Sequence, residues 1–153
     1  MRRLGEEEWA TYRRVRLDAL QEAPYAFGST YAAEKDRTED DWRKAVGARA
    51  RFVAEVDGAI VGTVSIADSN YGGAADVTAM WVDPRSRGVG VGDLLIRTVV
   101  EWAKKQGLAQ IFLWVANGND HAEVLYARNG FVRTGEATTN EHGKLEFEMK
   151  KQL

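Results

Sequence analysis

The feature that most constrains the fold is a strand-like segment that leads through a glycine-rich loop directly into a helix. Residues 75–82 carry β-favouring side chains, and the Asp-Pro pair at 83–84 ends the strand because proline cannot donate to a β-ladder. Glycines then occur at alternate positions within 88–92, where the apolar helical pattern of 90–106 begins. A strand that turns into a helix in this way indicates a layered protein in which helices cover a sheet.

The rest of the chain predicts further helices and strands in a mixed order. The expected elements are helices over 6–21, 38–48 and 120–128, a loop over 25–31, a hairpin of strands 51–56 and 59–67 around Asp57-Gly58, and strands over 111–115, 131–134 and 145–150. A turn-like stretch at 68–73, which includes Asn70 and Tyr71, leads into the strand at 75–82. This order predicts one α/β or α+β domain over residues 1–153 with a single central sheet.

Composition excludes several classes of function. The 153 residues hold 21 Lys and Arg against 23 Asp and Glu, a net charge of −2, so no basic field favours nucleic acid or an anionic membrane. The absence of cysteine excludes disulfides and a thiolate nucleophile, and two histidines are too few for a histidine-rich metal centre. Residues 1–6 lack the apolar segment of a secretory signal. We therefore expect a cytoplasmic protein that uses no metal.

The glycine-rich loop has the composition of an anion-binding site. Its glycines leave backbone N–H groups uncovered at the start of a helix, where these donors and the helix dipole attract phosphates, and Arg85 and Arg87 add charged donors. The loop lacks the Lys-Ser or Lys-Thr of a Walker A motif, and Asp93 stands where the dinucleotide pattern requires its last glycine. What remains is Arg-x-x-Gly-x-Gly at 87–92, either a pyrophosphate cradle or simply a tight strand-to-helix connection.

A second set of residues lies between 115 and 131. The pattern consists of Val115, Asn119, Ala122, Leu125-Tyr126 and Gly130-Phe131. Asn119 stands at a helix start, where it can cap the helix and offer an amide to a ligand, and Ala122 is small enough to let that ligand pass. Tyr126 follows Asn119 by two helical turns and therefore lies on the same side of the helix. The alternative for Tyr126 is a core residue with a satisfied hydroxyl.

Together, the two patterns resemble those of the GCN5-related N-acetyltransferases, the GNAT family, over roughly residues 50–150. The resemblance implies an α/β (α+β) fold with a single central mixed, mostly antiparallel twisted sheet of about six or seven strands, flanked by about four helices. It also implies an acetyl-CoA-binding core at 50–153 and a helical acceptor-side segment at 1–49. The family usually opens with a strand, for which residues 1–4 are barely long enough.

The resemblance also assigns roles to residues. Acetyl-CoA is the implied cosubstrate, and its pyrophosphate is assigned to the loop residues Arg87, Gly88, Val89, Gly90, Val91, Gly92 and Asp93. The pantetheine arm is assigned to the backbone of residues 80–82, which are Met80, Trp81 and Val82, and to the side chain of Asn119. Tyr126 is expected beside the thioester sulfur, where it protonates the departing CoA thiolate as a general acid or at least donates a hydrogen bond to it.

The implied reaction is transfer of the acetyl group to a primary amine by direct attack in a ternary complex. The absence of cysteine removes one covalent acyl-enzyme route. Many relatives carry a glutamate at the start of the 75–82 strand, where this chain has Asp76. Because its side chain is shorter, Asp76 is the candidate general base through water rather than by direct contact.

The acceptor is expected to be a small-molecule amine, because residues 23–30 resemble a segment of GNATs thought to modify small molecules. Four aromatic residues of this half either shape the acceptor pocket or pack as core and lid: Tyr25, Phe27, Tyr31 and Trp42. Two other functions stay open, a protein or peptide N-acetyltransferase and a non-catalytic domain that binds CoA as a sensor. A homodimer is possible.

Overall fold

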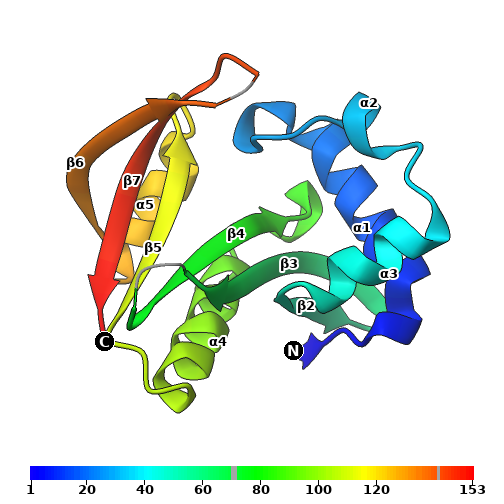
Figure 1. Ribbon diagram of the computed structural model, residues 1–153, viewed down its shortest axis with the longest axis horizontal. Coiled ribbons are helices and arrows are strands. Elements are labelled where there is room, and N and C mark those ends of the chain that lie inside the picture. The colour runs from blue at the N-terminus through cyan, green and yellow to red at the C-terminus, as the bar shows by residue number, and fades with distance from the viewer. Residues whose placement is uncertain (70–71, 141) are drawn as a thin grey trace.

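The computed structural model describes residues 1–69, 72–140 and 142–153, which form a seven-stranded sheet with helices on both faces (Figure 1). The strands are β1 (Arg2–Arg3), β2 (Ala50–Val56), β3 (Ala59–Asp68), β4 (Ala74–Val82), β5 (Gln110–Ala116), β6 (Val132–Thr139) and β7 (Leu145–Gln152). The α-helices are α1 (Trp9–Glu22), α2 (Tyr31–Glu34), α3 (Glu39–Gly47), α4 (Val91–Lys105) and α5 (Asp120–Arg128). The 3-10 turns are η1 (Glu6–Glu8), η2 (Pro24–Ala26) and η3 (Pro84–Ser86).

The sheet has the order β1-β2-β3-β4-β5-β7-β6, and its neighbours are antiparallel except for β4 and β5. The predicted mixed, mostly antiparallel sheet is therefore confirmed. The parallel pairs run from Ala74 with Gln110 to Val77 with Leu113. Beyond these pairs the two strands diverge, and Figure 1 shows the sheet opening between its two halves.

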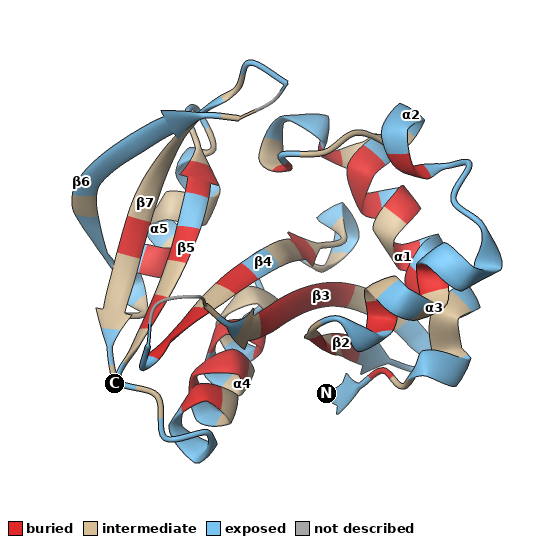
Figure 2. Cartoon of the chain, viewed as in Figure 1, coloured by how far each residue is buried: buried red, intermediate tan, exposed pale blue. Residues whose placement is uncertain are grey.

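Helices bury apolar side chains on both faces of the sheet. On one face α4 packs against β5, with Leu95, Val99 and Ile111 in the same buried cluster. On the other face α1 and α3 form a second cluster, in which Trp42 and Val53 are fully buried. Figure 2 shows the buried residues concentrated where the helices meet the strands. Burial of apolar surface is the main driving force for this arrangement, and it fixes the position of β4 between the two helical layers.

Local sequence signals account for several elements. Asp57 and Gly58 have φ angles of 51° and 80°, the left-handed pair that a two-residue hairpin turn requires. At the start of α3 the Thr38 hydroxyl accepts a hydrogen bond from the Asp41 N–H at 3.2 Å, and the Asp41 carboxylate accepts one from the Thr38 N–H at 3.0 Å. The predicted hairpin and capping box are therefore both confirmed.

Some boundaries differ from the sequence prediction. Within the segment expected as a loop, α2 begins because the Thr30 hydroxyl accepts a hydrogen bond from the Ala33 N–H at 3.1 Å. Strand β6 extends beyond the predicted 131–134, because an irregularity between Arg133 and Ala137 lets pairing with β7 resume. The short first strand is present as β1, paired with β2. In the predicted turn at 68–73, residues 70–71 lie outside the described residues.

Candidate active site

The candidate site lies where β4 and β5 diverge. Ala79 has a φ of 56°, and the register of β4 against β3 shifts between Thr63 and Ser65, which marks a β-bulge. On the other edge, the described pairs with β5 end at Val77. Residues 78–82 therefore present backbone groups toward the opening without a strand partner on that side. Because backbone N–H and C=O groups require partners, this edge is suited to pair with an extended ligand.

A cavity of about 570 Å³, which we call the glycine-loop cavity, opens beside this edge. It is lined by the end of β4, the loop before α4, the end of β5 and helix α5. Among its lining residues are Met80, Trp81, Val82, Arg87, Gly88, Gly90, Gly92, Asp93, Asn119, Ala122 and Tyr126. The structure thus brings the two sequence patterns together in one cavity, although they lie on different elements. Val89, Val91 and Asp76 are not among the lining residues.

The loop before α4 presents unoccupied backbone donors. Gly88 and Gly90 have φ angles of 79° and 93°, and Gly90 immediately precedes the first residue of α4. This left-handed conformation is strained for residues with a Cβ. In the described structure, no amide from Arg87 to Asp93 donates a backbone hydrogen bond of ordinary geometry. The predicted uncovered donors at the helix N-terminus are therefore present.

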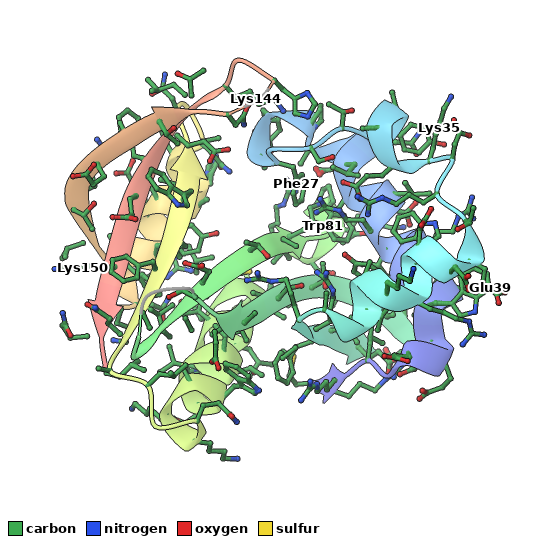
Figure 3. All side chains as sticks on the ribbon, in the orientation of Figure 1. Phe27, Lys35, Glu39, Trp81, Lys144 and Lys150 are labelled. Carbon is green, nitrogen blue, oxygen red and sulfur yellow. The ribbon has the colours of Figure 1, made fainter. Side chains whose placement is uncertain are left out.

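The two arginines of the loop point their guanidinium groups at carboxylates. Arg87 donates from Nη2 to both carboxylate oxygens of Glu22, at 2.8 and 2.9 Å, and from Nε to the Val82 carbonyl at 3.0 Å. Arg85 contacts both Asp83 oxygens at 3.2 Å. Glu22 also accepts a hydrogen bond from the Trp81 indole N–H at 3.1 Å, and Figure 3 shows Trp81 at this end of β4. In this geometry Arg87 joins α1 to the end of β4.

Asp93 uses its side chain to join two helices. Its carboxylate accepts hydrogen bonds from Arg128 at 2.9 and 2.7 Å and from the Asn129 amide at 2.8 Å. These hydrogen bonds, that from Arg128 above all, lower the pKa of Asp93 to about 2. A Cβ on the neighbouring Gly92 would lie 3.0 Å from Leu125 of α5, so the close contact of α4 with α5 favours glycine there. At position 93 only the backbone N–H is therefore available to an anion.

Tyr126 and Asn119, which belong to the pattern at 115–131, both line the glycine-loop cavity. Tyr126 is 6% exposed, its ring lies 6.0 Å from that of Phe131, and burial raises its pKa well above the ordinary tyrosine value. Its hydroxyl makes no hydrogen bond to the described residues. The satisfied core hydroxyl considered as the alternative is therefore not found. Asn119 precedes α5 but makes no side-chain cap, so its predicted capping role was wrong.

Asp76 lies on β4, immediately before the part of the strand that forms cavity walls. Its neighbours Ala75 and Val77 pack in the α4 core, so the alternation of the strand directs Asp76 to the opposite face. Burial raises its pKa, and this effect is opposed by the nearby charge of Arg49. Because Asp76 lines neither described cavity, its part as a base stays a prediction.

A second cavity of about 500 Å³, which we call the arginine cavity, lies on the α1 side of the same β4 segment. Its walls carry Tyr12, Arg16, Phe27, Gly28, Ser29, Glu34, Arg37, Arg49, Arg51, Trp114 and Glu146. It shares a wall with the glycine-loop cavity, formed by residues 77–79 of β4 together with Ala26, Phe27 and Trp114. The two cavities therefore meet where the pairing of β4 with β5 ends.

Sequence reasoning missed most of the arginine cavity. Arg16 donates two hydrogen bonds to Glu34, at 3.0 and 2.9 Å, across 18 positions of the chain. The rim is held by Lys144, which donates to the carbonyls of Pro24 and Phe27, the latter at 2.8 Å; Figure 3 labels Lys144 and Phe27 on these neighbouring segments. No sequence motif predicts such contacts, because the two partners of each contact lie in different segments, at separations that follow no regular spacing.

The predicted aromatic residues divide between cavity and core. Phe27 lines both cavities and Tyr25 lines the glycine-loop cavity. Trp42 is 0% exposed and packs edge-on against Tyr12 at 5.8 Å, so it is a core residue. Tyr31 lies outside both linings and packs beside the same core. The core alternative therefore holds for Trp42 and Tyr31.

A model of the acetyltransferase (GNAT) family matches residues 6–131, and the chain therefore belongs to this family. Among curated proteins, it is 39% identical over 85 residues to an N-acetyltransferase of Methanocaldococcus jannaschii described as uncharacterized, which covers 52% of this chain. It is 28% identical over 119 residues to the IAA acetyltransferase of Azospirillum brasilense, covering 78% of each protein. The chain spans only 38% of the Methanocaldococcus protein and 27% of a second relative, from Bacillus subtilis.

Solved structures show the same fold. An acetyltransferase of the GNAT family from Streptococcus pneumoniae matches with a TM-score of 0.83 at 21% identity, over 99% of this chain and 97% of that one. A protein from Salmonella typhimurium, solved with its cofactor acetyl-CoA, matches with a TM-score of 0.78 at 17% identity, over 99% of this chain and 92% of that one. The predicted GNAT fold is therefore confirmed.

Two features are absent from the residues that the structure describes. None of their helices has the length and apolar character that crossing a membrane requires. The same residues contain no cluster of three or more His, Asp or Glu side chains that could hold a metal ion.

Proposed function

We propose that this chain transfers an acetyl group from acetyl-CoA to the primary amine of a small molecule, by direct attack in a ternary complex. One observation carries the proposal: two cavities of different chemistry meet at the same segment of β4, residues 77–79, where its pairing with β5 ends. The glycine-loop cavity has the backbone donors for a pyrophosphate, and the arginine cavity has the charged groups for a polar acceptor. Their shared wall is where the thioester and the amine would meet.

The glycine-loop cavity is assigned to acetyl-CoA. The amides of residues 87–93 would donate to the pyrophosphate, since the Arg87 and Asp93 side chains are engaged with protein groups. The free edge of residues 80–82 would pair with the amides of the pantetheine arm, beside the Asn119 side chain. The Salmonella typhimurium protein that shares this fold was solved with acetyl-CoA, which supports the assignment without fixing any contact here.

Tyr126 is assigned to the departing sulfur. Burial keeps its hydroxyl protonated at neutral pH, so it is available as a donor. A thiol has a pKa of about 8.5, below that of ordinary tyrosine, so a hydrogen bond to the forming thiolate is favoured over complete proton transfer. In the step, the amine nitrogen bonds to the acetyl carbon and the carbon–sulfur bond breaks. The proton lost by the amine leaves through water, with Asp76 as the proposed relay, and a proton from water completes the CoA thiol.

The acceptor is assigned to small molecules with support from relatives. One relative is an IAA acetyltransferase, and another, 32% identical over 85 residues, is a streptothricin acetyltransferase of Streptomyces lavendulae. A cytoplasmic location, a homodimer and the division into an acceptor-side segment 1–49 and a CoA-binding core 50–153 stay predictions from the sequence.

Binding and turnover test the proposal separately. Acetyl-CoA at about 100 times its dissociation constant is expected to stabilise the fold by about 2.7 kcal/mol, measured as a rise in Tm. Release of CoA thiol in the presence of a panel of amines then measures transfer. A Tm rise without thiol release from any small amine or peptide would identify a CoA-binding sensor, and release only with peptides would identify a peptide N-acetyltransferase.

A further inference from the structure

Arg49 is a half-buried cation on the wall of the arginine cavity, and its guanidinium group is only partly satisfied by protein groups. The residue lies between α3 and β2, and its Nη2 donates to the backbone carbonyl of Asp76. Its Nε is buried and has no hydrogen-bond partner among the described residues. Buried polar groups almost always have partners, so a guanidinium group that the protein leaves partly unsatisfied at a cavity wall favours a ligand that accepts from its accessible nitrogens.

The other arginines of this cavity are engaged with protein groups. Arg16 and Arg37 both donate to Glu34, which is 1% exposed, and the Arg37 contact is 3.2 Å. Arg51 donates to the Ala45 carbonyl at 2.9 and 2.7 Å and to the Ser65 hydroxyl at 2.7 Å. Among the arginines that line the cavity, Arg49 is therefore the one with a buried donor still to be satisfied in the described residues.

The charge of the lining favours an anion. The cavity carries four arginines, Arg16, Arg37, Arg49 and Arg51, against the two carboxylates Glu34 and Glu146. A guanidinium group matches the planar carboxylate in geometry and charge.

Arg49 also lies close to the place of reaction. It bonds the Asp76 carbonyl, and the wall shared with the glycine-loop cavity begins at the next residue, Val77. An anion held by Arg49 therefore lies within a few atoms of that wall. A short spacing between anion and amine is the chemistry of an α-amino acid, in which the two groups sit on one carbon.

We propose, as an extension of the function proposed above, that the acceptor is an amino acid whose carboxylate is bound by Arg49 while its α-amine faces residues 77–79. Phe27 and Trp114, which lie on the shared wall, would then contact an apolar side chain. Binding of the carboxylate neutralises the cation. Arg49 is thereby a specificity-determining residue.

The test compares amino acids with amines that differ only by loss of the carboxylate. Thiol release is measured for phenylalanine against phenethylamine and for leucine against isoamylamine, with an aminoalkylphosphonate as the dianionic analogue. We expect kcat/KM to be about 10²-fold higher for each amino acid than for its decarboxylated partner, as a hydrogen-bonded ion pair predicts. The phosphonate is expected to react more slowly than the carboxylate.

Variants then assign the preference to one side chain. Arg49→Gln is expected to raise KM for the amino acids by about 10²-fold, to affect the decarboxylated amines far less and to leave the acetyl-CoA-induced Tm rise unchanged, and Arg49→Lys is expected to be intermediate. Arg43→Gln is the matched control, because Arg43 lies on the outer side of α3, paired with Glu39 at 3.2 Å. The wild-type comparison is independent of whether the variants fold.

Several results would overturn the inference. These are equal kcat/KM for both members of each pair, preference for the phosphonate, acetylation of no carboxylate-bearing amine, or an equal loss with both kinds of amine in Arg49→Gln. If acetyl-CoA still raises Tm and decarboxylated amines are acetylated, the inference alone has failed. If acetyl-CoA neither binds nor is consumed, the proposed function has failed with it.

Discussion

The glycine-loop cavity and the arginine cavity share a wall but are built by different means. The first is made largely of backbone groups and small residues from two continuous patterns, at 80–93 and 115–131. The second is made of long charged side chains from segments as distant as Tyr12 and Glu146. Backbone donors depend on the conformation of the loop and hardly on its side chains. They are therefore suited to a ligand that is common to a whole family. Charged side chains select a particular partner, since each can be exchanged without changing the fold.

The largest effect is expected from placing a negative charge in the backbone cradle. Gly90→Asp adds a carboxylate beside the proposed pyrophosphate site, and we expect an affinity for acetyl-CoA about 10³-fold lower, because like charges at a contact cost several kcal/mol. Isothermal titration calorimetry measures the change in Kd. The same substitution also strains the backbone by about 1 kcal/mol, because the φ of Gly90 is 93°.

Gly135→Asp is the matched control for this strain. Gly135 has a φ of 95°, and a Cβ there would meet no atom within 4 Å, as at Gly90. Both variants should lose similar free energy of unfolding, and only Gly90→Asp should lose acetyl-CoA binding. Equal affinity in the two variants would show that the loop is merely a tight connection.

The next effect concerns the side chain assigned to the departing sulfur. Tyr126→Phe is expected to lower kcat by about 10²-fold, because it removes a donor to the charge that develops on sulfur. KM for acetyl-CoA and Tm should change little, because the hydroxyl has no hydrogen bond to the described residues. Steady-state kinetics and thermal melting measure these quantities.

Tyr31→Phe serves as its control, since Tyr31 lies outside both cavities. Unchanged kcat in Tyr126→Phe would remove the tyrosine from the mechanism. Because burial raises the pKa of Tyr126, wild-type kcat should also show no loss from tyrosine ionisation between about pH 8 and pH 10.

A smaller effect is expected from the proposed water-mediated base. Asp76→Asn should lower kcat/KM about tenfold at neutral pH, less than the 10²-fold or more typical of a base in direct contact. A base acts only when deprotonated, so wild-type activity should fall as pH decreases through the pKa of Asp76, which burial raises above its ordinary value. The variant should lack this acidic limb. A pH profile with the same limb in both proteins would exclude Asp76.

The smallest effect is expected from the contact between α4 and α5. The pKa of Asp93 is lowered to about 2, so its ion pair with Arg128 stabilises the fold above pH 3.8 and is lost as pH falls toward 2. Asp93→Asn should therefore reduce the free energy of unfolding at pH 7 by about 1 kcal/mol at most, because the pair is partly exposed. Urea unfolding at pH 7 and pH 3 measures the difference, which should shrink at the lower pH.

Asp93→Asn also separates backbone from side chain in the cradle. Since only the Asp93 N–H is proposed to reach the pyrophosphate, acetyl-CoA affinity should not decrease. Glu39→Gln, which breaks the exposed pair with Arg43, controls for loss of a surface carboxylate. A large loss of affinity in Asp93→Asn would mean that its side chain contributes to the ligand site directly.

The sequence predicted well the parts of the fold that depend on neighbouring residues. The turn at Asp57-Gly58, the cap at Thr38 and the donors of 87–93 all follow from a few consecutive residues, and each was confirmed. The two patterns at 87–92 and 115–131 were expected to face one ligand because they resemble a family, and they do line one cavity.

The remainder depends on pairs that no local pattern contains. Arg87 meets Glu22 across 65 positions, and Lys144 meets Phe27 across 117. In the sequence alone, nothing distinguishes the Glu22 carboxylate from the other carboxylates of the chain, or the Phe27 carbonyl from the other backbone carbonyls. For the same reason Arg49 did not stand out, since its unpartnered Nε exists only once α3, β2 and β4 have come together.

A crystal structure with bound acetyl-CoA tests the central claim most directly. We expect the diphosphate oxygens to accept hydrogen bonds from amides between Arg87 and Asp93, the pantetheine arm to run along residues 80–82, and the sulfur to lie within hydrogen-bonding distance of the Tyr126 hydroxyl. A diphosphate bound away from these amides, or a thioester outside the wall shared by the two cavities, would contradict the claim.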